Sequence, residues 1–165
     1  MKAKTIKGTT VQEIKTQLEE CLQDNFMPTL ATVFISVKQD INAISKILDD
    51  KGIKIIGATT AGEFTDKGIE KGSVGILLLE LNTAYFTISC VEYEYGTAFD
   101  VTKELGRMGA ERFSNPGFII CGSGIYQQGN EISDGIIEGS NTTVLIGGMS
   151  GPLSWISMVT KAVRI

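Results

Sequence analysis

Hydrophobic and polar positions alternate in blocks along the chain, and the spacing inside each block predicts helices and strands in turn. Helices are predicted where apolar residues recur every three or four positions, and strands where β-branched and apolar residues run together. The predicted helices are 11–22, 41–51, 98–113 and 132–138. The predicted strands are 4–7, 29–36, 53–58, 73–81, 84–92, 118–121, 143–146 and 155–165.

The ends of these blocks carry recognisable signals. Thr10 followed by Glu13 is a capping box, and Asp40 is an N-cap for the second helix. The short joint at Asn82-Thr83 predicts an antiparallel hairpin between its two flanking strands. The order of elements predicts an α/β fold in one domain spanning residues 1–165. Its architecture would be a mixed β-sheet with a central antiparallel hairpin and helices packed on it. No internal repeat recurs at a fixed period.

Composition narrows the class of protein. The chain has 165 residues, 42% hydrophobic and 21% charged, which is ordinary for a globular domain. The formal net charge of −4, without a basic stripe, argues against a nucleic-acid partner. The longest apolar run, Val74 to Leu79, is far too short to span a membrane, and the N-terminus lacks the apolar stretch of a secretory signal. Cys21, Cys90 and Cys121 show no close spacing and predict reduced thiols in a cytoplasmic protein.

The chain contains no histidine. This removes Ser-His-Asp and Cys-His catalysis and imidazole-ligated zinc or haem, so we expect no metal, no cofactor and no enzymatic activity. A histidine-free enzyme would have to use carboxylates or lysine, and a hydroxyl nucleophile would need a base such as a lysine. Those candidates are Glu63, Asp66, Glu131 and Asp134, and Ser36, Thr60 and Ser123. The simpler interpretation of the acids is that they are solvated loop or helix-start residues.

Glycines cluster after predicted strands rather than inside predicted helices. Three such segments, 57–63, 122–130 and 147–151, consist largely of small and polar residues. In open α/β sheets, ligands bind outside the carboxyl ends of strands, where small residues let the backbone approach closely. Tight turns alone would also explain each segment. The predicted ligand-binding residues are Gly57, Thr59, Thr60, Gly62, Glu63, Gly122, Ser123, Gly124, Gly147 and Gly148.

Two stretches carry a family resemblance. Residues 53–64 form a strand with a glycine followed by the turn Thr60-Ala61-Gly62-Glu63, and Gly147-Gly148 closes a later strand. Over residues 28–151 the chain resembles the FIST family N-terminal domain. The resemblance implies a bacterial or archaeal intracellular sensory module that binds small ligands such as amino acids. It also implies a C-terminal partner domain or signalling protein.

Two function hypotheses follow from these observations. The first is an intracellular sensory domain that binds a small polar ligand, such as an amino acid, in signal transduction. The alternative is a protein-interaction or assembly domain without a small-molecule ligand, which would pair through the open edge of the predicted hairpin. A homodimer is compatible with either hypothesis.

Overall fold

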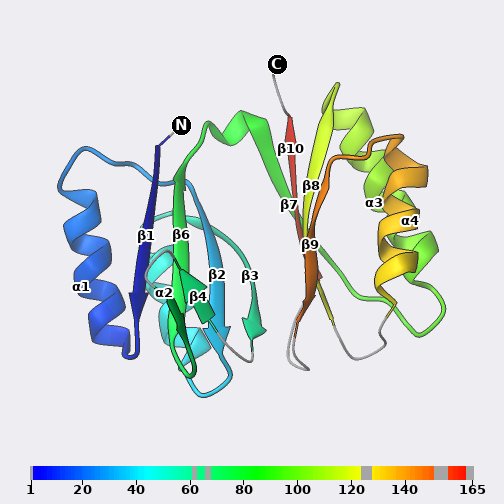
Figure 1. The fold of residues 1–165 in the computed structure, drawn as a ribbon. Helices are drawn as coiled ribbons and strands as arrows, with labels where there is room; N and C mark the ends of the chain where they lie inside the picture. Colours follow the sequence, from blue (N-terminus) through cyan, green and yellow to red (C-terminus); the bar gives the residue numbers. More distant parts are fainter. Residues whose placement is uncertain (1, 61–62, 66–67, 124–127, 151–155, 163–165) are drawn as a thin grey trace. The chain divides into compact units, whose positions relative to one another are not determined.

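The computed structural model describes residues 2–60, 63–65, 68–123, 128–150 and 156–162. The chain divides into two compact units, Met1–Thr83 (unit 1) and Ala84–Ile165 (unit 2). Each unit holds a four-stranded mixed sheet with helices on one face of it (Figure 1). The predicted α/β fold class, with helices packed on mixed β-sheet, is confirmed. The strands are divided between two such sheets and a two-stranded one, rather than gathered in one sheet.

Unit 1 contains the first two helices and a sheet in the order β1-β6-β2-β3. Only β2 and β3 are parallel, and the helix α2 connects them. A small antiparallel pair, β4 and β5, precedes β6. The elements are β1 (Lys2–Gly8), α1 (Val11–Leu22), β2 (Leu30–Ser36), α2 (Ile41–Asp49), β3 (Lys54–Thr60), β4 (Glu63–Thr65), β5 (Gly68–Glu70) and β6 (Val74–Glu80).

Unit 2 has a sheet in the order β7-β10-β8-β9, with β8 and β9 parallel and α4 between them. A single 3-10 turn, η1 (Thr83–Tyr85), precedes β7. The remaining elements are β7 (Phe86–Val91), α3 (Ala98–Arg112), β8 (Pro116–Ser123), α4 (Gly129–Ser140), β9 (Leu145–Ser150) and β10 (Ile156–Ala162).

The two units share one topology. Each runs strand, helix, strand, helix, strand, with a last strand that inserts antiparallel between the first and second. Strands β1, β2, β3 and β6 thus correspond to β7, β8, β9 and β10, and helices α1 and α2 to α3 and α4. Unit 1 adds the β4–β5 pair. The chain is therefore a structural repeat, although its sequence shows no fixed period.

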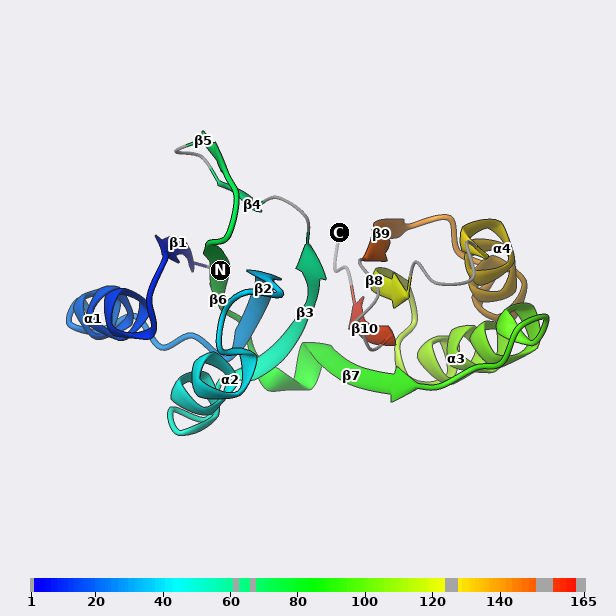
Figure 2. The same cartoon turned by 90° about the horizontal axis from the view of Figure 1, so that it is seen from below.

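The helices and the sheet of unit 1 enclose a core of large aliphatic side chains. Helix α1 contributes Ile14 and Leu18, and α2 contributes Ile44 and Leu48, all 0–1% exposed. They pack against alternate residues of β2 and β6, as expected for strands with one face toward the helices. Figure 2 shows α1 and α2 on the same side of this sheet.

In unit 2 the two helices pack on each other as well as on the sheet. A Cβ atom placed on Gly139 would lie 2.0 Å from the Lys103 carbonyl oxygen, and one on Gly106 would lie 2.5 Å from that of Ile136. Such distances require glycine, because the backbones of α3 and α4 touch. The expectation that glycines lie outside helices is therefore wrong here, and α4 extends beyond the predicted 132–138 in both directions.

The predicted hairpin between residues 73–81 and 84–92 does not form. Strand β6 pairs with β1 on one edge and β2 on the other, so neither edge is available to β7. Strand β7 instead pairs with β10. The joint at Asn82-Thr83 leads into the η1 turn rather than a two-residue reversal.

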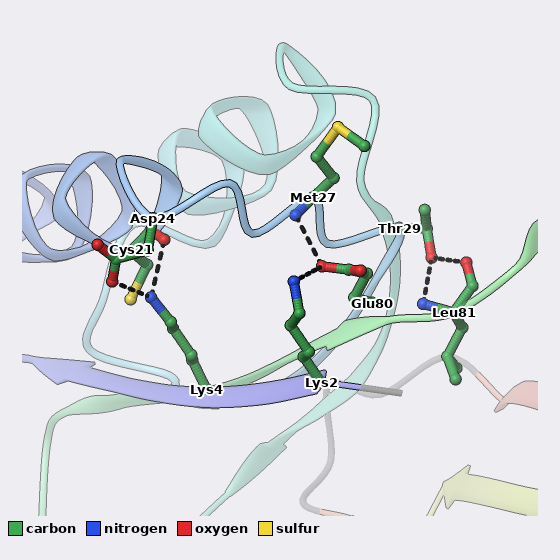
Figure 3. Close-up of polar contacts among 8 residues, drawn as sticks. All are labelled: Lys2, Lys4, Cys21, Asp24, Met27, Thr29, Glu80 and Leu81. Atoms are coloured by element: carbon green, nitrogen blue, oxygen red, sulfur yellow. Dashed lines mark hydrogen bonds and ion pairs between the residues drawn. The ribbon is translucent and has the colours of Figure 1, made fainter.

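Polar contacts fasten the segment after α1 to the sheet of unit 1 (Figure 3). From β1, Lys4 Nζ donates to the Cys21 carbonyl oxygen at 3.0 Å and lies 2.9 Å from Asp24 Oδ2. On β6, Glu80 Oε2 accepts from Met27 N–H at 3.1 Å. These contacts hold the chain between α1 and β2 in place, since that segment has no ladder of its own.

Candidate functional site

The carboxyl ends of β8 and β9 lie side by side in unit 2. The parallel ladder pairs Ile120 with Gly147, Cys121 with Gly148, and Ser123 with Ser150. Helix α4 begins shortly after β8 and runs back along the sheet to β9, as in other strand–helix–strand crossovers. This is the edge of an α/β sheet at which ligands characteristically bind.

A hollow of about 290 Å³ lies between the first turns of α4 and the end of this parallel pair. Its walls combine glycine backbone, one hydroxyl and several apolar side chains. The lining residues are Ile120, Gly129, Ile132, Ser133, Leu145, Gly147, Gly148 and Met149.

Met149 lies across two glycines of the neighbouring elements. A Cβ atom on Gly122 of β8 would meet Met149 Sδ at 3.0 Å, and one on Gly129 of α4 would meet it at 3.8 Å. The Met149 side chain is 39% exposed, whereas Ile120 and Ile132 beside it are 6% and 3% exposed. The thioether is thus the adaptable wall of the hollow, and the two isoleucines form its fixed floor.

Several hydrogen bonds hold the surrounding backbone in position. Ser150 Oγ donates to the Gly122 carbonyl oxygen at 2.9 Å, which joins the ends of β9 and β8. Ser133 Oγ donates to the Asn130 carbonyl oxygen at 2.9 Å within α4. The buried Gln128 accepts from Gly96 N–H at 3.3 Å, so the loop before α3 is tied to the start of α4.

The titratable groups near the hollow offer little reactivity. Burial raises the pKa of the Cys121 thiol to about 11, so this cysteine stays protonated at neutral pH. Glu131 and Asp134 are exposed on α4. Among the residues that the structure describes, no three His, Cys, Asp or Glu side chains form a metal-binding group.

Unit 1 places Gly57, Thr59 and Thr60 at the corresponding edge of its own sheet. There the parallel ladder pairs Val33 with Gly57 and Ser36 with Thr60, matching the pairs Ile120–Gly147 and Ser123–Ser150 of unit 2. A Cβ atom on either paired glycine would lie within 2.2 Å of a neighbouring carbonyl oxygen.

Thr59 differs from every other buried polar side chain that the structure describes. It is 4% exposed, and its Oγ1 atom has no hydrogen-bond partner. The ladder registers make Thr59 the counterpart of Met149. Each residue lies one position before the last pair of its parallel ladder, which is Ser36–Thr60 in unit 1 and Ser123–Ser150 in unit 2.

The structure thus brings together four of the ten predicted binding residues in unit 2: Gly122, Ser123, Gly147 and Gly148. All four lie within β8 or β9, because the ladder continues past the predicted strand ends. Gly57, Thr59 and Thr60 belong to β3 of unit 1. Gly62 and Gly124 lie outside the described residues, and Glu63 begins β4 with a side chain that the structure does not describe.

Gly129 and Met149 lay in the candidate segments 122–130 and 147–151 but were not among the predicted binding residues. Sequence reasoning missed the other lining residues, namely Ile120, Ile132, Ser133 and Leu145. A signal was present in part. Gly129, Ile132 and Ser133 follow the three- and four-residue spacing of one helix face. The predicted helix start at residue 132 hid this relation.

The chain folds into two α/β units of one topology, and unit 2 has a hollow of about 290 Å³ at the carboxyl ends of a parallel strand pair. The FIST N domain family matches residues 29–155, and the chain belongs to that family. The resemblance drawn from the sequence is confirmed, and the matched range includes residues of both units. FIST domains are sensory domains of signal transduction, which is not an enzymatic class.

A search of curated proteins finds no match to this chain. Within the part of the chain that the structure describes, no helix has the length and apolar character needed to cross a membrane.

Proposed function

We propose that this FIST domain senses a small ligand, such as an amino acid, by binding it in the hollow of unit 2. The observation that carries the proposal is the hollow itself, at the carboxyl ends of a parallel strand pair and beside the start of a helix. Ligands of α/β sheets characteristically occupy this place.

The start of α4 supports a ligand with a carboxylate. The first N–H groups of a helix have no partner within the helix, and they carry partial positive charge. Gln128, at the N-cap, makes no side-chain cap hydrogen bond, because its amide oxygen accepts from Gly96 instead. Backbone N–H groups at the first turn of α4 would therefore receive the carboxylate. The Ser133 oxygen, whose O–H already donates to Asn130, would accept from the ligand's ammonium group.

The cellular setting is part of the same proposal. Free Cys21, Cys90 and Cys121 fit a reducing compartment, so we place the domain in the cytoplasm. A C-terminal partner domain or a separate signalling protein would receive the signal. Such a signal requires the ligand to favour one conformation of the domain over another.

Ligand titration of the whole chain tests the proposal. Each of the twenty standard L-amino acids is added singly while thermal unfolding and the amide resonances of Gly147 and Gly148 are followed by NMR. A ligand at 100 times its Kd stabilises the folded chain by about 2.7 kcal/mol. We expect at least one amino acid to raise the Tm and shift both resonances, while the amide of Leu48, in the core of unit 1, stays unchanged. If none of the twenty does so, the proposal is wrong.

An assembly role has one supporting observation of its own. Strand β9 is the last strand in its sheet order, and Val144 and Ile146 beside and within it are 57% and 69% exposed. Apolar edge strands readily pair with another chain. Light scattering at rising concentration distinguishes the two roles, since an assembly domain forms dimers without added ligand.

A further inference from the structure

The structural repeat allows the two units to be compared residue by residue around the hollow. When α2 and α4 are aligned at their first residues, Ile44 corresponds to Ile132 and Leu48 to Ile136. All four of these side chains are 0–3% exposed, which supports the alignment. On the strands, the ladder registers align Gly57 with Gly147.

Two positions differ between the units in a way that bears on the hollow. Gly129, which lines the hollow, aligns with Ile41, the first residue of α2. Met149, the adaptable wall, aligns with Thr59 of β3. Unit 1 therefore carries a large side chain where unit 2 has none, and a hydroxyl where unit 2 has a thioether.

We propose that Gly129 and Met149 determine which ligand the hollow accepts, and that this ligand is an amino acid with an apolar side chain. The inference rests on the proposed function. Gly129 keeps the space beside α4 open, since a Cβ atom there would already lie 3.8 Å from Met149 Cγ and Sδ. Met149 covers the apolar part of the ligand, because its unbranched thioether adapts to different shapes.

The lining supports an apolar ligand body. Four of the eight described lining residues carry aliphatic or thioether side chains. The one hydroxyl among those eight, on Ser133, already donates to the Asn130 carbonyl oxygen. Among the residues that the structure describes, no charged side chain lines the hollow. A charged ligand side chain would lose its water there without a partner, which is strongly unfavourable. The hollow's volume of about 290 Å³ is at the small end for ligand sites and suits a ligand as small as an amino acid.

The experiment compares apolar and charged amino acids on the whole chain. L-leucine, L-isoleucine and L-methionine form the apolar set, and L-aspartate and L-lysine the charged set. Affinity is taken from the amide shifts of Gly147 and Gly148 during titration. We expect the apolar set to bind at least 10-fold more tightly than the charged set.

Variants that copy unit 1 into unit 2 test the two residues. Gly129→Ile should weaken binding of the apolar set at least 10-fold, while Gly129→Ala, with its Cβ in ordinary contact, should change it less than 3-fold. Met149→Thr should weaken binding of the apolar set, and Met149→Leu should retain it. Circular dichroism verifies that each variant is folded. If Gly129→Ile does not fold, the comparison of Met149→Thr with Met149→Leu tests the proposal.

The outcomes separate this inference from the proposed function. Tighter binding of L-aspartate or L-lysine at the same resonances would overturn the apolar preference and leave ligand sensing intact. Unchanged affinity in folded Gly129→Ile or in Met149→Thr would overturn the role of that residue. If no amino acid binds at all, both the inference and the proposed function fail.

Discussion

Units 1 and 2 share the same order of strands and helices, yet different residue types pack their helices. Helices α1 and α2 of unit 1 contain no glycine and pack through large aliphatic side chains such as Leu18 and Leu48. In unit 2 the backbones of α3 and α4 meet directly at Gly106, Gly135 and Gly139. One strand topology thus accepts both kinds of packing, because the ladders depend on the backbone and the helix layer depends on side-chain volume.

The two units also differ in the side chains at the carboxyl ends of their parallel strands. Unit 2 has Gly129 and Met149 beside its hollow, whereas unit 1 has Ile41 and the unpartnered Thr59 at the aligned positions. The two units therefore share a topology but not the side chains at the ends of their strands. A binding role is a property of particular side chains rather than of the shared topology.

The largest expected loss of stability comes from a substitution that disrupts the contact between α3 and α4 in unit 2. Gly139→Ala places a methyl group 2.0 Å from the Lys103 backbone oxygen, and backbone cannot move aside as a flexible side chain does. We expect a loss of about 3 kcal/mol in the free energy of unfolding, measured in urea. Gly129→Ala is the matched control in the same helix and should lose nothing, because its new methyl group has room. An equal effect of the two substitutions would show that α3 and α4 do not touch as described.

The next effect concerns the buried hydroxyl of unit 1. Thr59→Val removes an oxygen that has no partner, so we expect a gain of about 1 kcal/mol in unfolding free energy. Thr102→Val in unit 2 is the matched substitution of a fully buried threonine whose Oγ1 donates to the Ala98 carbonyl oxygen at 2.7 Å. That variant should lose up to about 1 kcal/mol instead. Opposite signs in thermal unfolding sharpen the comparison, and a destabilised Thr59→Val would mean that this oxygen is bonded in solution.

An effect of similar size is expected at the start of α2, which has a side-chain cap that α4 lacks. Asp40 Oδ1 accepts from Ala43 N–H at 2.9 Å and caps α2, whereas Gln128 makes no such bond for α4. Asp40→Ala should lower the unfolding free energy by about 1 kcal/mol, and Asp40→Asn, which keeps a capping oxygen, by much less. Chemical unfolding of the two variants in parallel provides the measurement. Equal losses would assign the effect to charge rather than to the cap.

The smallest effect is a pH dependence at the start of α1. Hydrogen bonds donated by Thr9, first from its backbone N–H and then from its hydroxyl, lower the pKa of Glu13. The stabilisation is therefore present above the unfolded value of about 4.3 and is lost as pH falls through the lower folded value. Unfolding of Glu13→Gln between pH 3 and 6 should show a flatter acid limb than the parent chain. Parallel acid limbs in the two proteins would contradict this contribution.

Much of the fold could be predicted from local patterns. The caps at Thr10 and Asp40 and the spacing of apolar residues placed three helices correctly, because these signals act within a few residues. Strand ends were predicted less well. Gly147 and Gly148 were expected to follow a strand, yet β9 includes them, because pairing with β8 outweighs the weak strand propensity of glycine.

The candidate site was predicted only in outline. The glycines of β8 and β9 were recognised, since small residues at strand ends are a general sign of close backbone approach. The apolar walls were not, because Leu145 and Met149 look like ordinary core residues in a sequence. Their place beside Gly129 depends on how α4 crosses the sheet.

The sequence by itself determined the α/β class, the family, most of the helices and the absence of imidazole chemistry, because these depend on composition and on neighbours along the chain. Tertiary structure alone decided that β6 lies between β1 and β2, that the chain forms two units of one topology, and that α3 and α4 meet through glycines. Strand partners and helix contacts join residues far apart in the sequence. Their choice depends on which edges and surfaces are still unoccupied, and no local pattern records that.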